Sequence, residues 1–309
     1  MTSAVGRTTS GATFVAPSSI ADAVAAIAAG ARVVAGGTDL IVGSRQGKWQ
    51  IPEQLVAIHR VAALRGIRLA AGGGLWLGAL VSHRDIATDA GIRRNYTALA
   101  DASAIVGSDA TRHIGTIGGN LVNASPAAET SGPLLCFGGI VTLESPGGRR
   151  AVSLDEFFTG PGRTVTRPDE LLVAVELPAL PAGSGSCYAR LEYRQQMEIA
   201  VVGATAVVTL SGGRVTAAKV AITALAPTVR RGPEAEAALI GSDGGREAAE
   251  RAASAAAEAS RPIDDVRAPA DYRRAMAAVI TRRVVQAAVA RARGETVAIP
   301  ASAALHGAV

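Results

Sequence analysis

The sequence predicts an α+β protein of two domains, and three observations support this. The 309-residue chain is long enough to bury two hydrophobic cores. Its first part alternates between short apolar runs and amphipathic segments, and hairpin patterns with glycine turns come after it. A stretch rich in proline, glycine and serine, ALPAGSGS at 179–186, then predicts a boundary between residues 1–178 and residues 179–309.

The first lobe is expected to cover about residues 1–60 and to hold a small parallel sheet. Ser19 can cap a helix that Gly30 ends, and a second helix begins at Thr38 or Asp39. Each helix connects two apolar runs, which favours parallel strands. The expected strands are 13–17, 31–35 and 53–60.

The second lobe, about residues 61–178, is expected to be α+β with a largely antiparallel sheet. Glycine turns inside apolar runs indicate hairpins, and Pro178 ends the last run. The expected elements are two strands within 66–80, a helix from Ser82, a helix over about 92–105, a hairpin at 138–154 and a strand at 169–178.

The C-terminal part predicts a three-stranded antiparallel sheet followed by helices. Its strands are expected at about 187–194, 199–210 and 214–223, and its helices at about 233–241, 245–259 and 270–293. The longest apolar run, IAVVGATAVVTL at 199–210, has twelve residues, which is too short for a membrane span. Because the N-terminus also lacks the pattern of a signal peptide, we expect a soluble, cytoplasmic protein.

Composition argues against several classes of function. The net charge of +5 comes without a dense basic tract, so nucleic-acid binding is not expected. Cys136 and Cys187 stand far apart without a CxxC motif, and the four histidines show no metal-ligand spacing. The sequence therefore predicts no iron–sulfur cluster and no metal site in this chain, and a reducing compartment.

The first candidate site is VVAGGTDL at residues 33–40. A buried strand ends in two glycines and a helix begins, so free N–H groups and the helix dipole can attract an anion. The motif is neither G-x-G-x-x-G nor a P-loop, since it lacks the lysine of the latter. The alternative is an ordinary strand–helix turn.

The second candidate site is GTIGGN at residues 115–120, interpreted as another glycine-rich anion loop. Two such loops could hold a diphosphate without a lysine, and Asn120 and Asn123 would add side-chain donors. Glu129 could accept a hydrogen bond from the same ligand. The alternative is a tight structural turn.

Together, VVAGGTDL and IGTIGGNLVNASPAAE resemble the FAD-binding medium subunits of molybdenum hydroxylases, the group of xanthine, carbon monoxide and aldehyde dehydrogenases. The resemblance continues in LDEFFTGPGRT, PDELLVAVELP, ITALAPTVRRGPEAEAAL and DDVRAPADYRRAM, and so covers essentially the whole chain. It implies a two-lobed FAD-binding domain of the vanillyl-alcohol-oxidase (PCMH) type, followed by a C-terminal domain with a small antiparallel sheet and helices.

The resemblance also implies partners and a direction of electron flow. A large subunit would oxidise the substrate at a molybdopterin cofactor, and a small subunit with two [2Fe–2S] clusters would pass electrons to FAD in this chain. The assembly would be of the (αβγ)₂ type. The external acceptor stays open among NAD⁺, dioxygen, a quinone and another carrier, and the large subunit would choose the substrate.

Matched position by position, the resemblance implies three groups of FAD contacts. The first group, around the diphosphate, is Val33, Val34, Ala35, Gly36, Gly37, Thr38, Asp39 and Leu40. The second is Thr116, Gly119, Asn120, Val122 and Asn123. The third is Glu129, expected at the adenosine ribose where the family usually has aspartate, and Leu172, expected against the flavin or the adenine.

Two departures from the family pattern concern the flavin ring. Ile105 and Val106 stand where some members have an aromatic residue, so the ring would be covered by aliphatic side chains. Arg190 stands where many members have a lysine, and its permanent charge would favour an anionic reduced flavin. The alternative for Arg190 is a solvated charge at a strand end. Tyr193 and Arg194 could also border the ring.

No nucleophile–base pair is evident, because His59, His83, His113 and His306 have no convincing partner. The chemistry is therefore expected to belong to the cofactor. Two other interpretations remain open at this point. One is a docking subunit without flavin, which Glu129, Arg190 and the aliphatic cover motivate. The other is a stand-alone flavin oxidase, for which the sequence offers no acid–base group.

Overall fold

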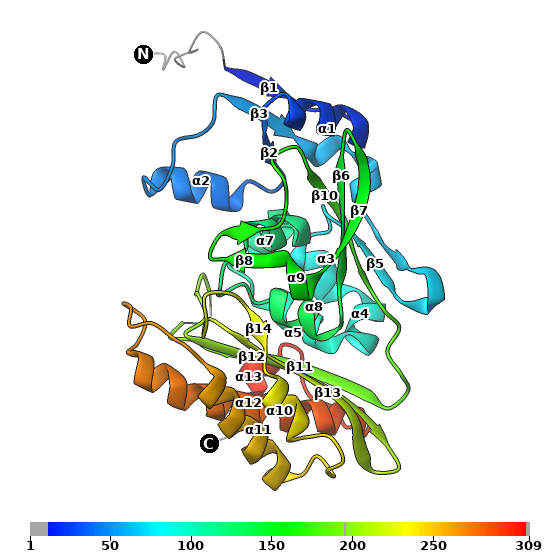
Figure 1. Cartoon of the computed structure of the whole chain (residues 1–309), viewed down its shortest axis with the longest axis vertical. Helices are drawn as coiled ribbons and strands as arrows, with labels where there is room; N and C mark the ends of the chain where they lie inside the picture. Colours follow the sequence, from blue (N-terminus) through cyan, green and yellow to red (C-terminus); the bar gives the residue numbers. More distant parts are fainter. Residues whose placement is uncertain (1–11, 195, 307–309) are drawn as a thin grey trace.

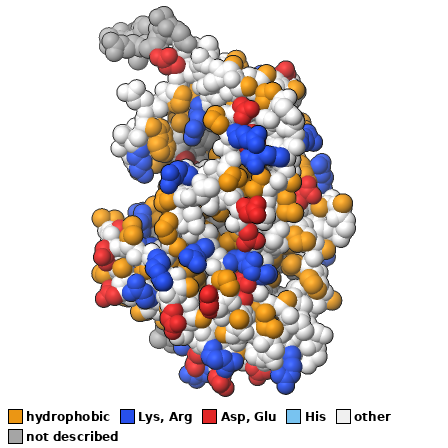
Figure 2. Space-filling view, viewed as in Figure 1, with side chains coloured by type: hydrophobic (Ala, Val, Ile, Leu, Met, Phe, Trp, Pro, Cys, Tyr) orange, Lys and Arg blue, Asp and Glu red, His pale blue; other side chains and the backbone are white. Residues whose placement is uncertain are grey.

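A computed structural model describes residues 12–194 and 196–306. Residues 1–11, which belong to the predicted first lobe, and the side chain of His306 lie outside what it describes. The chain forms three parts that follow one another along the long axis in sequence order (Figure 1). Positive and negative side chains are interspersed over the face shown in Figure 2.

The first lobe is a three-stranded sheet, parallel as the sequence predicts, with the strand order β1-β3-β2. Ser19 caps the first helix by accepting a hydrogen bond from the Asp22 N–H at 3.1 Å. The elements are β1 (Thr13–Val15), α1 (Ile20–Ala28), β2 (Arg32–Val34), α2 (Thr38–Arg45) and β3 (Gln54–Ala57). A short 3₁₀ turn at Ile58–Arg60 replaces the end of the longer third strand that the sequence predicts.

The second lobe is built on a five-stranded antiparallel sheet with the order β4-β5-β10-β6-β7. Its strands are β4 (Ile67–Leu69), β5 (Leu75–Gly78), β6 (Ile140–Ser145), β7 (Gly148–Ser153) and β10 (Leu171–Leu177), and β8 (Phe158–Gly160) and β9 (Arg163–Thr164) form a separate pair. The hairpins and the strand at 169–178 agree with the sequence prediction. The core between sheet and helices contains Leu77, Leu99, Leu121 and Leu143, all fully buried.

The structure has more helices in this lobe than the two that the sequence predicts. They are α3 (His83–Thr88), α4 (Ala90–Asn95), α5 (Thr97–Ala104), α6 (Asp109–Ile114), α7 (Ile117–Asn123), α8 (Ser131–Cys136) and α9 (Leu154–Phe157). The single helix expected over 92–105 is divided into α4 and α5, because Tyr96 has a non-helical backbone between them. Another difference is α7, which lies where a glycine loop is expected.

The C-terminal domain is a four-stranded antiparallel sheet with the order β11-β12-β13-β14, covered by helices (Figure 1). Its elements are β11 (Ser184–Leu191), β12 (Val202–Ser211), β13 (Arg214–Thr223), β14 (Arg230–Arg231), α10 (Pro233–Ala237), α11 (Arg246–Ala259), α12 (Ala270–Ala292) and α13 (Ala301–His306). The prediction of three strands misses β14, whose two residues are too few to show an alternating pattern. None of the helices in the described part is long and apolar enough to cross a membrane.

A buried ion pair joins the second lobe to the C-terminal domain. Asp101 of α5 is fully buried, and its carboxylate accepts hydrogen bonds from Arg291 of α12 at 2.6 and 3.1 Å. The same carboxylate accepts from the backbone N–H groups of Tyr188 at 3.2 Å and Ala301 at 3.0 Å. Four elements of the chain therefore meet at one carboxylate, which fixes how the two parts pack.

Candidate functional site

The two glycine segments singled out in the sequence are in direct backbone contact. Gly36 follows β2, and a Cβ atom added to it would lie 2.1 Å from the Ile114 carbonyl oxygen and 3.3 Å from the Gly115 Cα. Only glycine permits this approach between the first and second lobes. Both segments therefore lie at one place, as expected of two parts of a single site.

The first segment ends in an open helix N-terminus, as the sequence predicts. Gly37 is the N-cap of α2 with φ of 71°, a conformation that favours glycine, and it provides no side-chain cap. The first helical hydrogen bond runs from Ile41 N–H to the Gly37 carbonyl at 3.0 Å. Within the described residues, the N–H groups of Thr38, Asp39 and Leu40 have no hydrogen-bond acceptor, so they can serve a ligand.

The second segment corrects the sequence interpretation, because it is a helix whose first N–H groups are already used. Thr116 is the N-cap of α7, and its hydroxyl accepts from the Gly119 N–H at 3.1 Å. The N–H groups of Ile117 and Gly118 donate to the carbonyls of Val81 and Ala79 at 2.9 and 3.0 Å. GTIGGN therefore does not double the number of free backbone donors.

The motif needs a glycine at position 118 because this position packs against the backbone of Ala79. An added Cβ would lie 2.7 Å from the Ala79 Cβ and 2.8 Å from its carbonyl oxygen, so the requirement comes from packing against the sheet. Gly119 is different: it is half-buried, and an added Cβ would meet only the Thr116 Oγ1, at 3.0 Å. This face of α7 has room for a ligand.

Two side-chain amides lie on this part of α7, and each already has a hydrogen-bond partner in the chain. The Asn123 Nδ2 donates to the Asp39 Oδ1 at 3.2 Å, which connects α7 to the first turn of α2 across the two lobes. The Asn120 Oδ1 accepts from the buried Thr130 hydroxyl at 2.6 Å, which orients the amide. Val122 is 39% exposed beside them. Figure 2 shows the surface indented on the same side, between α2 and the C-terminal domain.

Glu129 and Arg190 are partners of each other. The Arg190 side chain is fully buried, and its Nη1 donates to the Glu129 Oε1 at 2.5 Å and to the Glu198 carbonyl at 3.3 Å, while its Nε donates to Glu192. The interpretation of Arg190 as a solvated strand-end charge is therefore wrong. Burial raises the pKa of the Glu129 carboxyl, an effect that the Arg190 charge opposes.

The remaining predicted contacts lie on different elements. Ile105 is buried at the end of α5, and the half-buried Val106 follows it, with its carbonyl accepting from Arg112 at 3.2 Å. Leu172 of β10 is buried in the core of the second lobe. Tyr193 is 65% exposed on the loop after β11, which approaches the 105–111 region because Met197 N–H donates to the Gly107 carbonyl at 3.0 Å.

Three of the histidines lie near the second segment. His83 is buried beneath the second segment, and its backbone N–H donates to the Gly115 carbonyl at 3.1 Å. Burial, with a smaller contribution from the Arg112 charge, lowers the pKa of His83 to about 4. His113 is exposed, and its Nδ1 lies 2.9 Å from the Asp109 carbonyl. Across the described residues, no cluster of histidine, cysteine or carboxylate side chains could hold a metal ion.

The low pKa of His83 predicts acid sensitivity of the fold. The unfolded imidazole takes up a proton near pH 6.5, whereas the folded one does so only near pH 4, so stability falls as the pH drops between these values. From pH 7 to pH 5 this residue should remove about 2 kcal/mol from the free energy of unfolding. Urea titrations at both pH values should show that His83→Gln has the smaller decrease. An equal decrease in both proteins would contradict the buried, neutral state.

A cavity of about 220 Å³ lies next to the contact between the segments. Residues from five parts of the chain line it, and its lining includes Ala35 and Gly36 from the first segment and Thr116 from the second. The other lining residues with polar side chains are His59, Arg65, Ser82, Asp85 and His113. The sequence points to His113 by its place beside the second segment and to Ser82 as a helix start, whereas no motif connects His59, Arg65 or Asp85 to the site.

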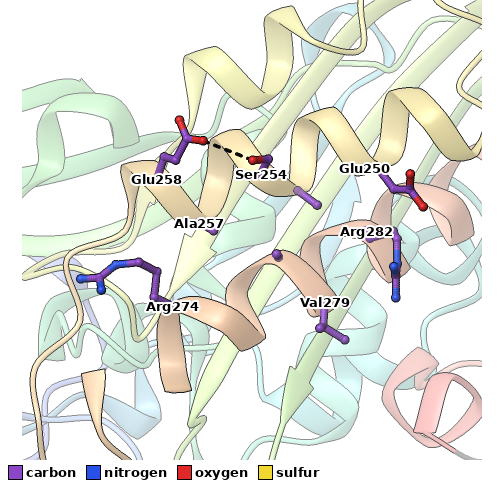
Figure 3. Close-up of a pocket in the computed structure, with 9 residues that line it drawn as sticks. Glu250, Ser254, Ala257, Glu258, Arg274, Val279 and Arg282 are labelled. Carbon is purple, nitrogen blue, oxygen red and sulfur yellow. Dashed lines mark hydrogen bonds between the residues drawn. The ribbon is translucent and has the colours of Figure 1, made fainter. Parts of the chain in front are cut away.

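A second hollow, of about 350 Å³, lies between α11 and α12 in the C-terminal domain (Figure 3). Small side chains such as Ala257 form its floor, and Glu250, Glu258, Arg274 and Arg282 stand at its rim. None of the predicted site residues lines it. It is therefore a surface groove separate from the glycine segments.

Comparison with known protein families gives two matches along the chain. Residues 8–180 match the FAD binding domain in molybdopterin dehydrogenase. Residues 187–288 match the CO dehydrogenase flavoprotein C-terminal domain. The two matched regions meet near the proline- and glycine-rich stretch.

Similar proteins cover nearly the whole chain. The carbon monoxide dehydrogenase medium chain of Hydrogenophaga pseudoflava is 32% identical over 279 residues, which is 89% of this chain and 96% of the relative. The xanthine dehydrogenase FAD-binding subunit of Escherichia coli O157:H7 is 29% identical over 266 residues, or 86% and 91% of the two chains. A solved structure of the Hydrogenophaga carbon monoxide dehydrogenase superposes with a TM-score of 0.86 and 34% identity, covering 91% of this chain and 98% of the other.

Proposed function

This chain belongs to the FAD-binding subunits of the molybdenum hydroxylase family, and we propose that it carries electrons from a partner subunit's iron–sulfur clusters, through FAD, to an external acceptor. The observation that carries this proposal is the backbone contact of Gly36 with Ile114 and Gly115. It brings together the two segments that resemble the family's diphosphate-binding motifs.

The residues at this place suit an FAD diphosphate. The N-terminus of α2 offers uncapped N–H groups, and the helix dipole adds partial positive charge there. Gly119 leaves space on α7, and the amides of Asn120 and Asn123 stand beside it. Bound FAD would supply the redox chemistry, since it can accept and release one or two electrons.

The chain's own residues would orient the cofactor. We assign the diphosphate to Val33–Leu40 and to Thr116, Gly119, Asn120, Val122 and Asn123, as the motif resemblance implies. Leu172 and Val106 stay assigned as apolar contacts. For Glu129 and Arg190 the buried ion pair changes the proposed role: Arg190 connects Glu129 of the second lobe to Glu192 and to the Glu198 carbonyl, and the opposite charges compensate each other.

Substituting Gly119 tests the assignment of α7. Gly119→Val should raise the dissociation constant for FAD at least about 10-fold, because a side chain would occupy the ligand's space. Gly91→Val is a matched control: Gly91 also lies in the first turn of a helix, and an added Cβ would meet only the cap residue, Asp89, at 3.1 Å. Flavin absorbance and fluorescence titration of the purified proteins measure both.

The outcomes of this test separate the possible functions. Yellow wild-type and Gly91→Val proteins with a colourless Gly119→Val protein support the proposal. A fully yellow Gly119→Val protein would refute the role of α7. If the wild type neither contains nor takes up FAD, even together with subunits that co-purify, a docking subunit becomes the better interpretation. Reduction of the isolated chain by a small substrate would favour a stand-alone oxidase.

We also propose a division of labour between domains and subunits. Residues 1–178 would hold FAD. Residues 179–309 would complete the part of the site around the flavin ring and would contact the other subunits. The partners would be a large molybdopterin subunit and a small subunit with [2Fe–2S] clusters, in a cytoplasmic complex. Relatives that are named medium chain or FAD-binding subunit support this assembly. NAD⁺, dioxygen, a quinone or another carrier would act as acceptor.

A further inference from the structure

The cavity beside Gly36 contains a cation that neither motif includes. Arg65, which follows the short 3₁₀ turn Ala62–Leu64, lines this cavity together with Gly36 and Thr116. These two residues belong to the two segments assigned to FAD. Arg65 therefore shares a cavity with both halves of the proposed diphosphate site.

The backbone that carries Arg65 is firmly held. Leu64 is fully buried, and its carbonyl accepts from the Leu80 N–H at 2.8 Å. Gly78 packs so closely that an added Cβ would lie 2.9 Å from the Arg65 nitrogen. The Arg65 Nη2 in turn donates to the His59 carbonyl at 2.7 Å. Arg65 itself is exposed, and this hydrogen bond holds one nitrogen of its guanidinium against the neighbouring 3₁₀ turn.

Among the residues that line the cavity, Arg65 is the one with a permanent positive charge; the others with polar side chains are His59, Ser82, Asp85, His113 and Thr116. The Asp85 carboxylate is engaged in the cap of α3, where its Oδ2 accepts from Ser82 N–H at 3.3 Å and from Ser82 Oγ at 2.8 Å. The Thr116 hydroxyl accepts from Gly119 N–H, so its own proton can be donated to a ligand. A guanidinium and a hydroxyl are thus available to an anion.

We propose that Arg65 contacts the FAD diphosphate and supplies the positive charge that the glycine segments lack. This inference rests on the proposed function. It follows from the observation that the first N–H groups of α7 already have acceptors in the chain, so that fewer backbone donors face the diphosphate than two open loops would offer. The planar guanidinium can give two parallel hydrogen bonds to phosphate oxygens.

The test is the variant Arg65→Gln, with Arg60→Gln as the matched control. Arg60 lies on the neighbouring 3₁₀ turn, is exposed and does not line the cavity. FAD is titrated into the flavin-free protein, with co-purifying subunits retained, and ADP and riboflavin are used as competitors. Arg65→Gln should raise the dissociation constants of FAD and ADP at least about 10-fold relative to Arg60→Gln, because the charge-assisted hydrogen bonds of the guanidinium are lost. Competition by riboflavin, which has no phosphate, should not change.

The outcomes distinguish this inference from the proposed function. If the wild type and Arg60→Gln bind FAD and Arg65→Gln binds within 2-fold of them, Arg65 does not contact the diphosphate and the proposed function stands. If FAD binding weakens while ADP binding does not, Arg65 acts elsewhere and the inference fails. If the wild type does not bind FAD, the proposed function itself fails. Should Arg65→Gln not fold, Arg65→Lys replaces it, with an expected weakening of about 3-fold from the lost planar fork.

Discussion

Gly36→Val is expected to abolish FAD binding and to destabilise the chain. The new Cβ would overlap the Ile114 carbonyl, a backbone atom that cannot rotate away, so the two lobes would have to separate. We expect a loss of more than about 2 kcal/mol in the free energy of unfolding. Urea unfolding and the flavin absorbance of the purified protein measure the two effects.

A hairpin glycine provides the control for this substitution. Gly147 lies in the β6–β7 turn, where an added Cβ would meet only the Ser145 hydroxyl, at 3.6 Å. Gly147→Val should retain FAD and most of the stability. If Gly36→Val kept its flavin and its stability, the close backbone contact between the lobes would be refuted.

Arg190→Met is expected to have the second large effect, because it leaves the buried Glu129 carboxylate without its cation. Removing one partner of a buried ion pair typically costs about 3–5 kcal/mol. Arg194→Met is the control, since Arg194 is four residues away, its side chain is 68% exposed and its Glu198 partner is 3.5 Å distant. That variant should lose less than about 1 kcal/mol.

The pH dependence of Arg190→Met should identify the responsible carboxylate. Burial raises the pKa of Glu129, so its charged form is disfavoured in the folded state and stability falls as the pH rises above the ordinary glutamate range. In Arg190→Met, the loss of stability with rising pH should be larger than in the wild type. The difference in free energy of unfolding between the two proteins should therefore become smaller as the pH is lowered. The double variant with Glu129→Gln should recover part of the loss at pH 7. A deficit that is independent of pH and unaffected by Glu129→Gln would indicate lost packing instead.

The first glycine segment shows what the sequence can predict. An apolar run followed by two glycines and a helix former defines β2, Gly37 and α2 from local pattern alone, and each is found where expected. The hairpin at 138–154 is equally local, because its turn residues determine it. Such elements depend on interactions between close neighbours in the chain.

The second segment shows what local pattern misses. Glycine is a poor helix former, so a Gly-Gly pair suggests a loop. In the folded chain, Gly118 is needed because α7 packs against Ala79, which lies 39 residues earlier (118 − 79). Arg190 and Glu129 are 61 residues apart, and Arg65 reaches its cavity only because Gly78 and Leu80 fix its backbone. These relations arise from tertiary contacts, for which one sequence carries no direct signal.

The buried ion pairs between the second lobe and the C-terminal domain limit which C-terminal domains could replace the present one in a chimaeric protein. The second lobe contributes the carboxylates Asp101 and Glu129, whereas the C-terminal domain contributes the guanidiniums of Arg291 and Arg190. Each half therefore requires a partner half that has the opposite charges at these positions. A C-terminal domain of the same shape taken from another protein, but without arginines at these two positions, would bury two unpaired acids and would not join to this FAD-binding half.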